Sequence, residues 1–184
     1  MFIPSLGITA VDVSGSWSLF ESTAKHEAFH QFANSRFPDG LPAWLNEGLA
    51  EYFENTTYIN GAIIKGQVQY SRLQLLQRDI QSGGCIRFLE LMRMSLKTWN
   101  QNLAGENGSK QYRQSWAMVH FLIHANNGQF ASQFDDFLLL ISKGENHEKA
   151  FVKAFKTNDL ENFERVWSSY ILDLKPSSAL IAAH

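Results

Sequence analysis

Apolar residues recur at intervals of three and four along most of the chain, which is the spacing that places them on one face of a helix. This periodicity predicts helices at roughly 20–34, 42–54, 67–80, 88–92, 110–124, 130–142, 149–155 and 160–172. Strand patterns are rarer. Residues 8–13 alternate as a short strand does, and Asn60-Gly61 between apolar residues predicts a tight hairpin near 57–65. The sequence therefore predicts an α+β fold that is predominantly α-helical, with a small N-terminal β element.

Glycine and polar residues mark the ends of several of these helices. Gly83-Gly84 ends the helix at 67–80, and residues 105–109 are predicted to form a polar loop before the helix at 110–124. A chain of 184 residues has the length of one domain with a sizeable core. We expect a single domain over 1–184 with four parts: a short β region at 1–19, a motif-bearing part at 20–125, C-terminal helices at 126–175 and a tail at 176–184 that frays.

Composition and charge narrow the classes of function. The hydrophobic content of 45% and the charged content of 18% are those of a folded globular protein. A formal charge of −2 gives no electrostatic case for binding nucleic acid or an anionic membrane. No apolar run approaches the length of a membrane span. No signal peptide is visible, which weakly favours the cytoplasm, although a secreted chain trimmed behind its signal would look the same.

The single cysteine offers no obvious chemistry. Cys85 rules out an internal disulfide, and its neighbours include no histidine or other base that could activate the thiol. We interpret it as a buried or incidental thiol.

The helix at 20–34 carries the first group of chemically capable residues. His26 and His30 are four positions apart, so on a helix both imidazoles project from one face, where they can bind a single zinc ion. Glu27 lies beside them, within reach of a metal-bound water. Small and apolar residues surround the motif, so we expect this helix to be buried on most sides, where two histidines and a carboxylate need partners.

The next helix supplies two carboxylates. Glu47 and Glu51 are four residues apart in an otherwise apolar helix. A catalytic zinc site has three protein ligands and an open position, so Glu47 is the candidate third ligand. Glu51, one turn on, can accept a hydrogen bond from the far nitrogen of a ligand histidine. The alternative is that both glutamates face solvent, as most helical glutamates do.

A second histidine pair occurs later in the chain. His120 and His124 repeat the four-residue spacing, but with Arg113 and Asn127 they form one polar stripe at helical intervals. Because no third ligand is apparent, we interpret this stripe as a solvated face and not as a second metal site.

Two segments carry a family resemblance. The chain resembles the gluzincin metallopeptidases in His26-Glu27-Ala28-Phe29-His30 and in Trp44-Leu45-Asn46-Glu47-Gly48-Leu49-Ala50-Glu51-Tyr52. Its overall pattern is most similar to the DUF1570 family of the peptidase MA clan. The resemblance spans roughly residues 20–125 and implies a zincin-like metallopeptidase domain with one Zn²⁺. It also implies zinc ligands at His26, His30 and Glu47, a general base at Glu27 and a supporting acid at Glu51.

A third segment is similar to the M1 aminopeptidases. Residues 111–119 resemble the part of those enzymes whose tyrosine stabilises the oxyanion, which nominates Tyr112; the alternative is an aromatic residue anchoring the start of a helix. The chain lacks the Gly-x-Met-Glu-Asn motif that holds a substrate's free amino terminus, so the resemblance does not imply aminopeptidase specificity. The interval between His30 and Glu47 is also slightly shorter than in those enzymes.

These residues predict a metal-assisted hydrolysis, and the family resemblance implies that its substrate is a peptide bond. In a zinc peptidase, Glu27 takes a proton from metal-activated water that attacks a peptide carbonyl, and then passes it to the leaving amine. Tyr112 shares the charge that develops on the oxygen. The expected partner is a peptide or protein substrate. Two alternatives remain: a non-catalytic zinc-stabilised interaction module of the same fold, and a metal-free scaffold with a degenerate site.

Overall fold

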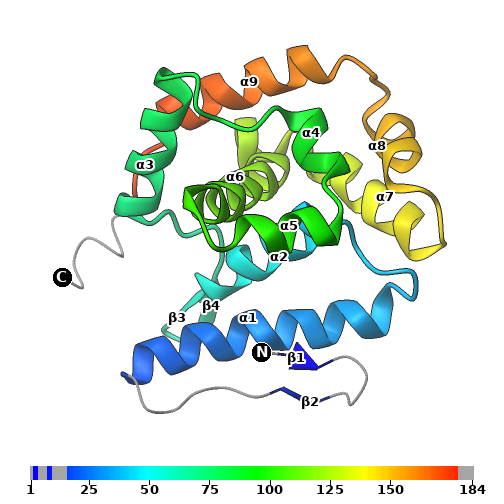
Figure 1. Ribbon diagram of the computed structural model, residues 1–184. Helices are drawn as coiled ribbons and strands as arrows, with labels where there is room; N and C mark the ends of the chain where they lie inside the picture. Colours follow the sequence, from blue (N-terminus) through cyan, green and yellow to red (C-terminus); the bar gives the residue numbers. More distant parts are fainter. Residues whose placement is uncertain (1, 4–7, 10–15, 178–184) are drawn as a thin grey trace.

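The computed structural model describes residues 2–3, 8–9 and 16–177, and these form a mostly helical structure with two small antiparallel sheets (Figure 1). The prediction of a predominantly helical α+β fold is therefore confirmed. One sheet pairs β1 (Phe2–Ile3) with β2 (Ile8–Thr9), and the other pairs β3 (Thr57–Ile59) with β4 (Ala62–Ile64). Residues 10–13 of the strand predicted at 8–13 lie outside the described part of the chain.

The helix that carries the histidine pair is α1 (Trp17–Arg36), with β1 and β2 alongside it (Figure 1). It begins three residues earlier than predicted because the Ser16 hydroxyl caps it, accepting a hydrogen bond from the Leu19 amide at 3.3 Å. The prediction that this helix would be buried on most sides is wrong: of its described residues only Phe29 and Ala33 are buried. Its core-facing stripe is narrow, and most of its other residues are partly or fully exposed.

Two helices form the centre of the molecule, α2 (Ala43–Glu54) and α6 (Glu106–Gly128). They pack so closely that a methyl group on Gly48 would lie 2.6 Å from the carbonyl oxygen of Ser115, which explains the glycine within the Glu47-Gly48 pair. Trp44 and Leu45 of α2 are fully buried on this core. The tight packing fixes α2 in register against α6 and so fixes the direction of Glu47.

The hairpin predicted near 57–65 is confirmed. Asn60 and Gly61 join β3 to β4, and both have positive φ angles, 50° and 85°. This is the two-residue turn that Asn-Gly favours, because its twist matches that of the flanking strands.

Three helices follow the hairpin: α3 (Tyr70–Gln81), α4 (Phe88–Arg93) and α5 (Leu96–Asn102). The first two agree with the predicted helices, apart from a later start of α3. The hydrophobic periodicity did not predict α5. The Ser95 hydroxyl caps this helix by accepting a hydrogen bond from the Thr98 amide at 3.1 Å, and its Trp99 side chain is buried in the core. The predicted polar loop at 105–109 is wrong beyond Gly105, since α6 already begins at Glu106.

The C-terminal part forms α7 (Ala131–Ser142), α8 (His147–Phe155) and α9 (Leu160–Asp173). Helix α7 packs against α6 and α8, and α9 packs against α6, α3 and α4. Asn126 and Asn127 have positive φ angles of 48° and 58° and end the regular part of α6. Phenylalanines fill the space between these helices: Phe121, Phe130, Phe137, Phe151, Phe155 and Phe163. The helices predicted at 130–142, 149–155 and 160–172 are confirmed.

The start of the predicted tail is anchored. The Ser177 hydroxyl accepts a hydrogen bond from the Val68 amide at 2.9 Å, and the Ser177 amide donates to the Val68 carbonyl at 3.1 Å. The expected fraying is therefore wrong at Ser177, and residues 178–184 lie outside the described part.

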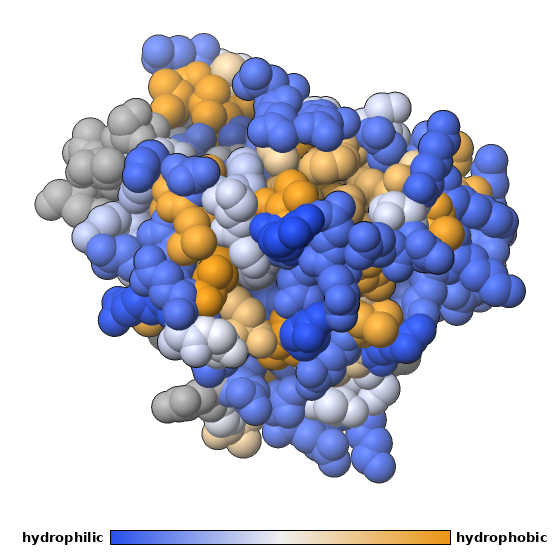
Figure 2. Space-filling model, turned by 90° about the horizontal axis from the view of Figure 1, so that it is seen from above, coloured by the Kyte–Doolittle hydropathy of each residue, from blue (hydrophilic) through white to orange (hydrophobic). Residues whose placement is uncertain are grey.

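The face that includes α9 is largely hydrophilic, with apolar residues scattered over it, as Figure 2 shows. Among the helices that the structure describes, none combines the length and the apolar character needed to cross a membrane.

Candidate metal centre

Two histidines of α1 and one glutamate of α2 converge on a single point. The Nε2 atom of His26 lies 3.4 Å from Oε2 of Glu47, and the Nε2 atom of His30 lies 3.6 Å from the same oxygen. The two imidazole rings are 4.8 Å apart between centroids and lie edge to face, on the one side of α1 that the four-residue spacing predicts. All three ligand atoms lie within 4.8 Å of one another.

This separation fits a zinc ion. Zinc binds histidine nitrogen and carboxylate oxygen at about 2.0–2.2 Å in a tetrahedron, which places two ligand atoms roughly 3.3–3.6 Å apart. The two distances to Glu47 lie in that range. His26, His30 and Glu47 could therefore hold zinc, with the fourth position of the tetrahedron left for another ligand.

The electrostatics of the site favour a positive charge between these residues. Burial opposes the charged form of His26, but hydrogen bonds to Glu47 and Glu54 outweigh it and raise its pKa to about 10. Burial likewise opposes the ionised form of Glu47, yet hydrogen bonds from His26 and His30 lower its pKa to about 2. A cation bound between these residues would compete with protons for the same ligand atoms.

The far nitrogens of both histidines are held by residues of α2. The Nδ1 atom of His26 donates to Oε2 of Glu54 at 3.0 Å, and Nδ1 of His30 donates to the side-chain oxygen of Asn46 at 3.3 Å. These contacts turn both Nε2 atoms towards Glu47 and fix the tautomers that a metal requires.

The structure corrects the prediction that Glu51 accepts the hydrogen bond from a ligand histidine. Glu51 lies near His26, but its carboxylate forms an ion pair with Arg72 of α3, and Glu54 accepts the hydrogen bond instead. Burial of Glu51 raises the pKa of its carboxyl, and Arg72 partly counteracts that effect. The sequence signal for Glu54 was present, since it follows Glu47 by seven residues and so lies on the same face of α2.

The three candidate ligands border a cavity of about 670 Å³ between α1, α2, α5 and α6. Glu27 and Tyr112 also line it, so the structure places both predicted catalytic residues at the same site. Burial, followed by the nearby charge of Glu47, raises the pKa of Tyr112 to about 12, which keeps the hydroxyl protonated at neutral pH. The Tyr112 ring packs edge-on against Trp99 with centroids 5.3 Å apart, and because α6 begins at Glu106, Tyr112 lies within the helix and not at its start.

The interpretation of His120 and His124 as a solvated face is wrong. His120 is 3% exposed; its Nε2 donates to the Gly66 carbonyl at 3.2 Å, and its Nδ1 accepts from the Tyr170 hydroxyl at 2.9 Å. Nε2 of His124 accepts from the Tyr52 hydroxyl at 2.8 Å. Burial lowers the pKa of His120 to about 4, so it is neutral at pH 7. The part-buried hydrogen bonds of this pair connect α6 to α2, to α9 and to the loop at Gly66.

Arg113 and Cys85 are structural residues and not part of the candidate metal site. Arg113, predicted to be part of the solvated stripe, is ion-paired with Asp79 at 2.6 Å and mostly buried. Cys85 is half-buried, and burial raises the pKa of its thiol to about 11, which agrees with the expectation of an incidental thiol.

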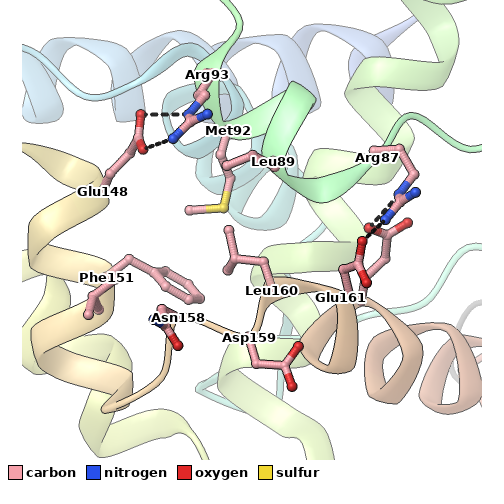
Figure 3. Close-up of a pocket in the computed structure, with 12 residues that line it drawn as sticks. Arg87, Leu89, Met92, Arg93, Glu148, Phe151, Asn158, Asp159, Leu160 and Glu161 are labelled. Carbon is pink, nitrogen blue, oxygen red and sulfur yellow. Dashed lines mark hydrogen bonds and ion pairs between the residues drawn. The ribbon is translucent and has the colours of Figure 1, made fainter.

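A separate cavity of about 430 Å³ lies between α4, α8 and α9 (Figure 3). Arg93 and Glu148 pair at one end, Arg87 and Glu161 pair at the other, and Met92 is among the apolar residues between them. Among the described residues, no histidine or cysteine lines this cavity, and its arginines already have carboxylate partners. Its ion pairs connect α4 to α8 and to α9.

Comparison with known proteins places the chain in one family. Residues 21–138, which hold both motif helices and Tyr112, match the family described as "Protein of unknown function (DUF1570)". No curated protein and no solved structure matches the chain.

Proposed function

The chain belongs to the DUF1570 family, and on that premise and the geometry of its site we propose that it is a zinc-dependent hydrolase of peptide bonds. One observation carries the proposal: His26 and His30 direct their Nε2 atoms at one oxygen of Glu47 over distances that suit tetrahedral zinc. The two-helix arrangement of these residues also supports assignment to the gluzincin type of the peptidase MA clan, with a zincin-like fold.

The open side of the site supports catalysis. His26, His30 and Glu47 border the 670 Å³ cavity, and among the described residues no further histidine, cysteine or acid joins them as a fourth ligand. Zinc held there supplies a Lewis acid that lowers the pKa of a bound water to about 7.

The residues of the chain supply the remaining steps. Glu27 accepts the proton of the attacking water and delivers it to the leaving amine. Tyr112, protonated at neutral pH, donates a hydrogen bond to the carbonyl oxygen as negative charge develops on it. Glu54 and Asn46 hold the two imidazoles in the orientation that binding requires.

Two variants test the proposal. Glu27→Gln removes the base and leaves the three ligands, so we expect zinc content to be retained and turnover of a mixed peptide library to fall at least about 100-fold. Glu47→Ala removes a ligand, so we expect zinc to be lost together with activity. Zinc is measured by elemental analysis of the purified proteins. Full activity of Glu27→Gln would refute the mechanism.

The alternative is a non-catalytic module in which zinc joins α1 to α2 and the surface binds a partner. The cavity at the ligand atoms favours the enzyme, because a structural zinc is normally enclosed by four protein ligands. A zinc-loaded protein that cleaves nothing in the mixed library, yet unfolds when zinc is removed, would support the module.

A further inference from the structure

The cavity that borders His26, His30 and Glu47 has walls with almost no charge. Beyond the three candidate ligands and Glu27, the residues that line it are neutral. Some of these residues are small or apolar (Ala33, Gly40, Leu41, Ala43 and Leu96), and the others carry an amide or a phenol (Asn34, Asn46, Asn100 and Tyr112). A substrate residue lying beside the ligands therefore meets an uncharged surface.

An enzyme that binds the terminal carboxylate of its substrate would need a cation in this cavity. No lysine or arginine is among the described residues that line the cavity. The undescribed segments, 1, 4–7, 10–15 and 178–184, contain no lysine or arginine in the sequence, so their side chains cannot provide one. A carboxypeptidase would leave the charged end of its substrate without a partner at this site, which is unfavourable in a partly desolvated cleft.

The cavity borders a second one at Tyr112, which lines both. This neighbour has a volume of about 470 Å³ and includes Arg72 and Arg113. Both arginines already form ion pairs within the chain, Arg72 with Glu51 and Arg113 with Asp79. The second cavity therefore leaves room for a bound peptide to continue past Tyr112. Its two arginines are both in ion pairs, so neither offers an unpaired charge to the end of that peptide.

Two amides on opposite elements of the cleft can bind a peptide backbone. Asn34 projects from α1 and Asn100 from α5, and neither side chain has a hydrogen-bond partner within the described part of the chain. Each amide has a donor and an acceptor, so each can pair with the N–H and C=O groups of an extended peptide.

We propose that this cleft takes the interior of a polypeptide chain, so that the protein is an endopeptidase that cleaves beside an uncharged, apolar residue. The inference rests on the hydrolase function proposed above and adds its substrate class. The neutral wall of Leu41, Ala43 and Leu96 accommodates the apolar side chain, and Asn34 and Asn100 bind the backbone on either side.

The test uses a mixed library of ten-residue peptides prepared twice, with free ends and with acetylated and amidated ends. We expect blocking of both ends to change kcat/KM less than threefold. Aspartate or lysine in place of leucine beside the cleaved bond should lower kcat/KM at least tenfold. A tenfold or greater loss on blocking the ends would overturn the inference and leave the hydrolase function intact. Absence of cleavage in both sets by zinc-loaded protein would overturn both proposals.

Leu96 provides a second readout that does not depend on turnover. It is 66% exposed at the start of α5, so Leu96→Lys can be made without disturbing the core. In the Glu27→Gln background, fluorescence anisotropy with blocked peptides should show at least fivefold tighter binding of the aspartate peptide after Leu96→Lys. Leu139→Lys on α7, 51% exposed and outside the cleft, is the matched control and should change nothing. Equal responses of the two variants would contradict the assignment of this wall.

Discussion

The substitution Glu54→Gln tests how the metal site is held together. Glu54 accepts the hydrogen bond from Nδ1 of His26 at 3.0 Å, and its side chain is 22% exposed. Glutamine keeps the size and an acceptor oxygen but removes the charge that makes this contact strong. The perturbation therefore acts on the basicity and orientation of a ligand without removing any ligand.

The size of the effect follows from the role of that contact. Carboxylates that hold a ligand histidine typically contribute a factor of about 10–100 in metal affinity, which is about 1.4–2.7 kcal/mol. We expect the Kd for zinc to rise by this factor in Glu54→Gln. Asn46→Ala removes the longer, uncharged contact to His30 at 3.3 Å and should raise the Kd by less than about tenfold.

The assay is a competition titration against a fluorescent zinc chelator at fixed pH and salt. Glu21→Gln is the matched control, because it removes a charge from α1 that pairs with Lys25 and leaves the site untouched. Glu51→Gln tests the alternative that Glu51 supports the ligand histidine, and circular dichroism checks that this variant folds. The reasoning is refuted if Glu54→Gln leaves the Kd within threefold of wild type while Glu51→Gln raises it tenfold.

Three further predictions concern stability. Zinc at 100 times its Kd should stabilise the fold by about 2.7 kcal/mol and raise Tm by about 5–10 °C in a thermal melt, and no rise would contradict a site that joins two helices. Gly48→Ala should cost at least 1–3 kcal/mol in urea unfolding, because its methyl group would meet the Ser115 carbonyl at 2.6 Å; the control Gly105→Ala, which meets nothing closer than 4.0 Å, should cost less. His120 has a folded pKa of about 4, below its unfolded value of about 6.5, so the unfolded chain gains the proton first and this stability is lost as pH falls from 6.5 to 4. The loss is about 3 kcal/mol, and urea unfolding of His120→Gln should show a correspondingly weaker pH dependence than wild type; an unchanged dependence would refute the assignment.

The sequence sufficed for features that depend on local spacing. The four-residue interval of His26 and His30 placed both rings on one face of a helix, and the hairpin at Asn60-Gly61 followed from the φ angles that those residues adopt readily. Glu47 was identified because a zinc site with two histidines needs a third ligand. Each of these predictions uses contacts within one helix or one turn, or the known chemistry of a metal.

Features that depend on tertiary packing were missed. Glu51 and Glu54 share a face of α2 with Glu47, and the choice between them is made by Arg72, which α3 brings to Glu51. The polar stripe of His120 and His124 has the spacing of a solvated face, but the Gly66 loop and α9 cover it. Helical periodicity reports which residues share a face and contains no information about what packs on that face.

Anomalous diffraction at the zinc absorption edge, from crystals of the zinc-loaded Glu27→Gln protein, tests the central claim most directly. The account predicts a single strong peak about 2.0–2.2 Å from the Nε2 atoms of His26 and His30 and from a carboxylate oxygen of Glu47, with the fourth position open to the cavity. A peak elsewhere, or a fourth protein ligand that closes the site, would contradict it.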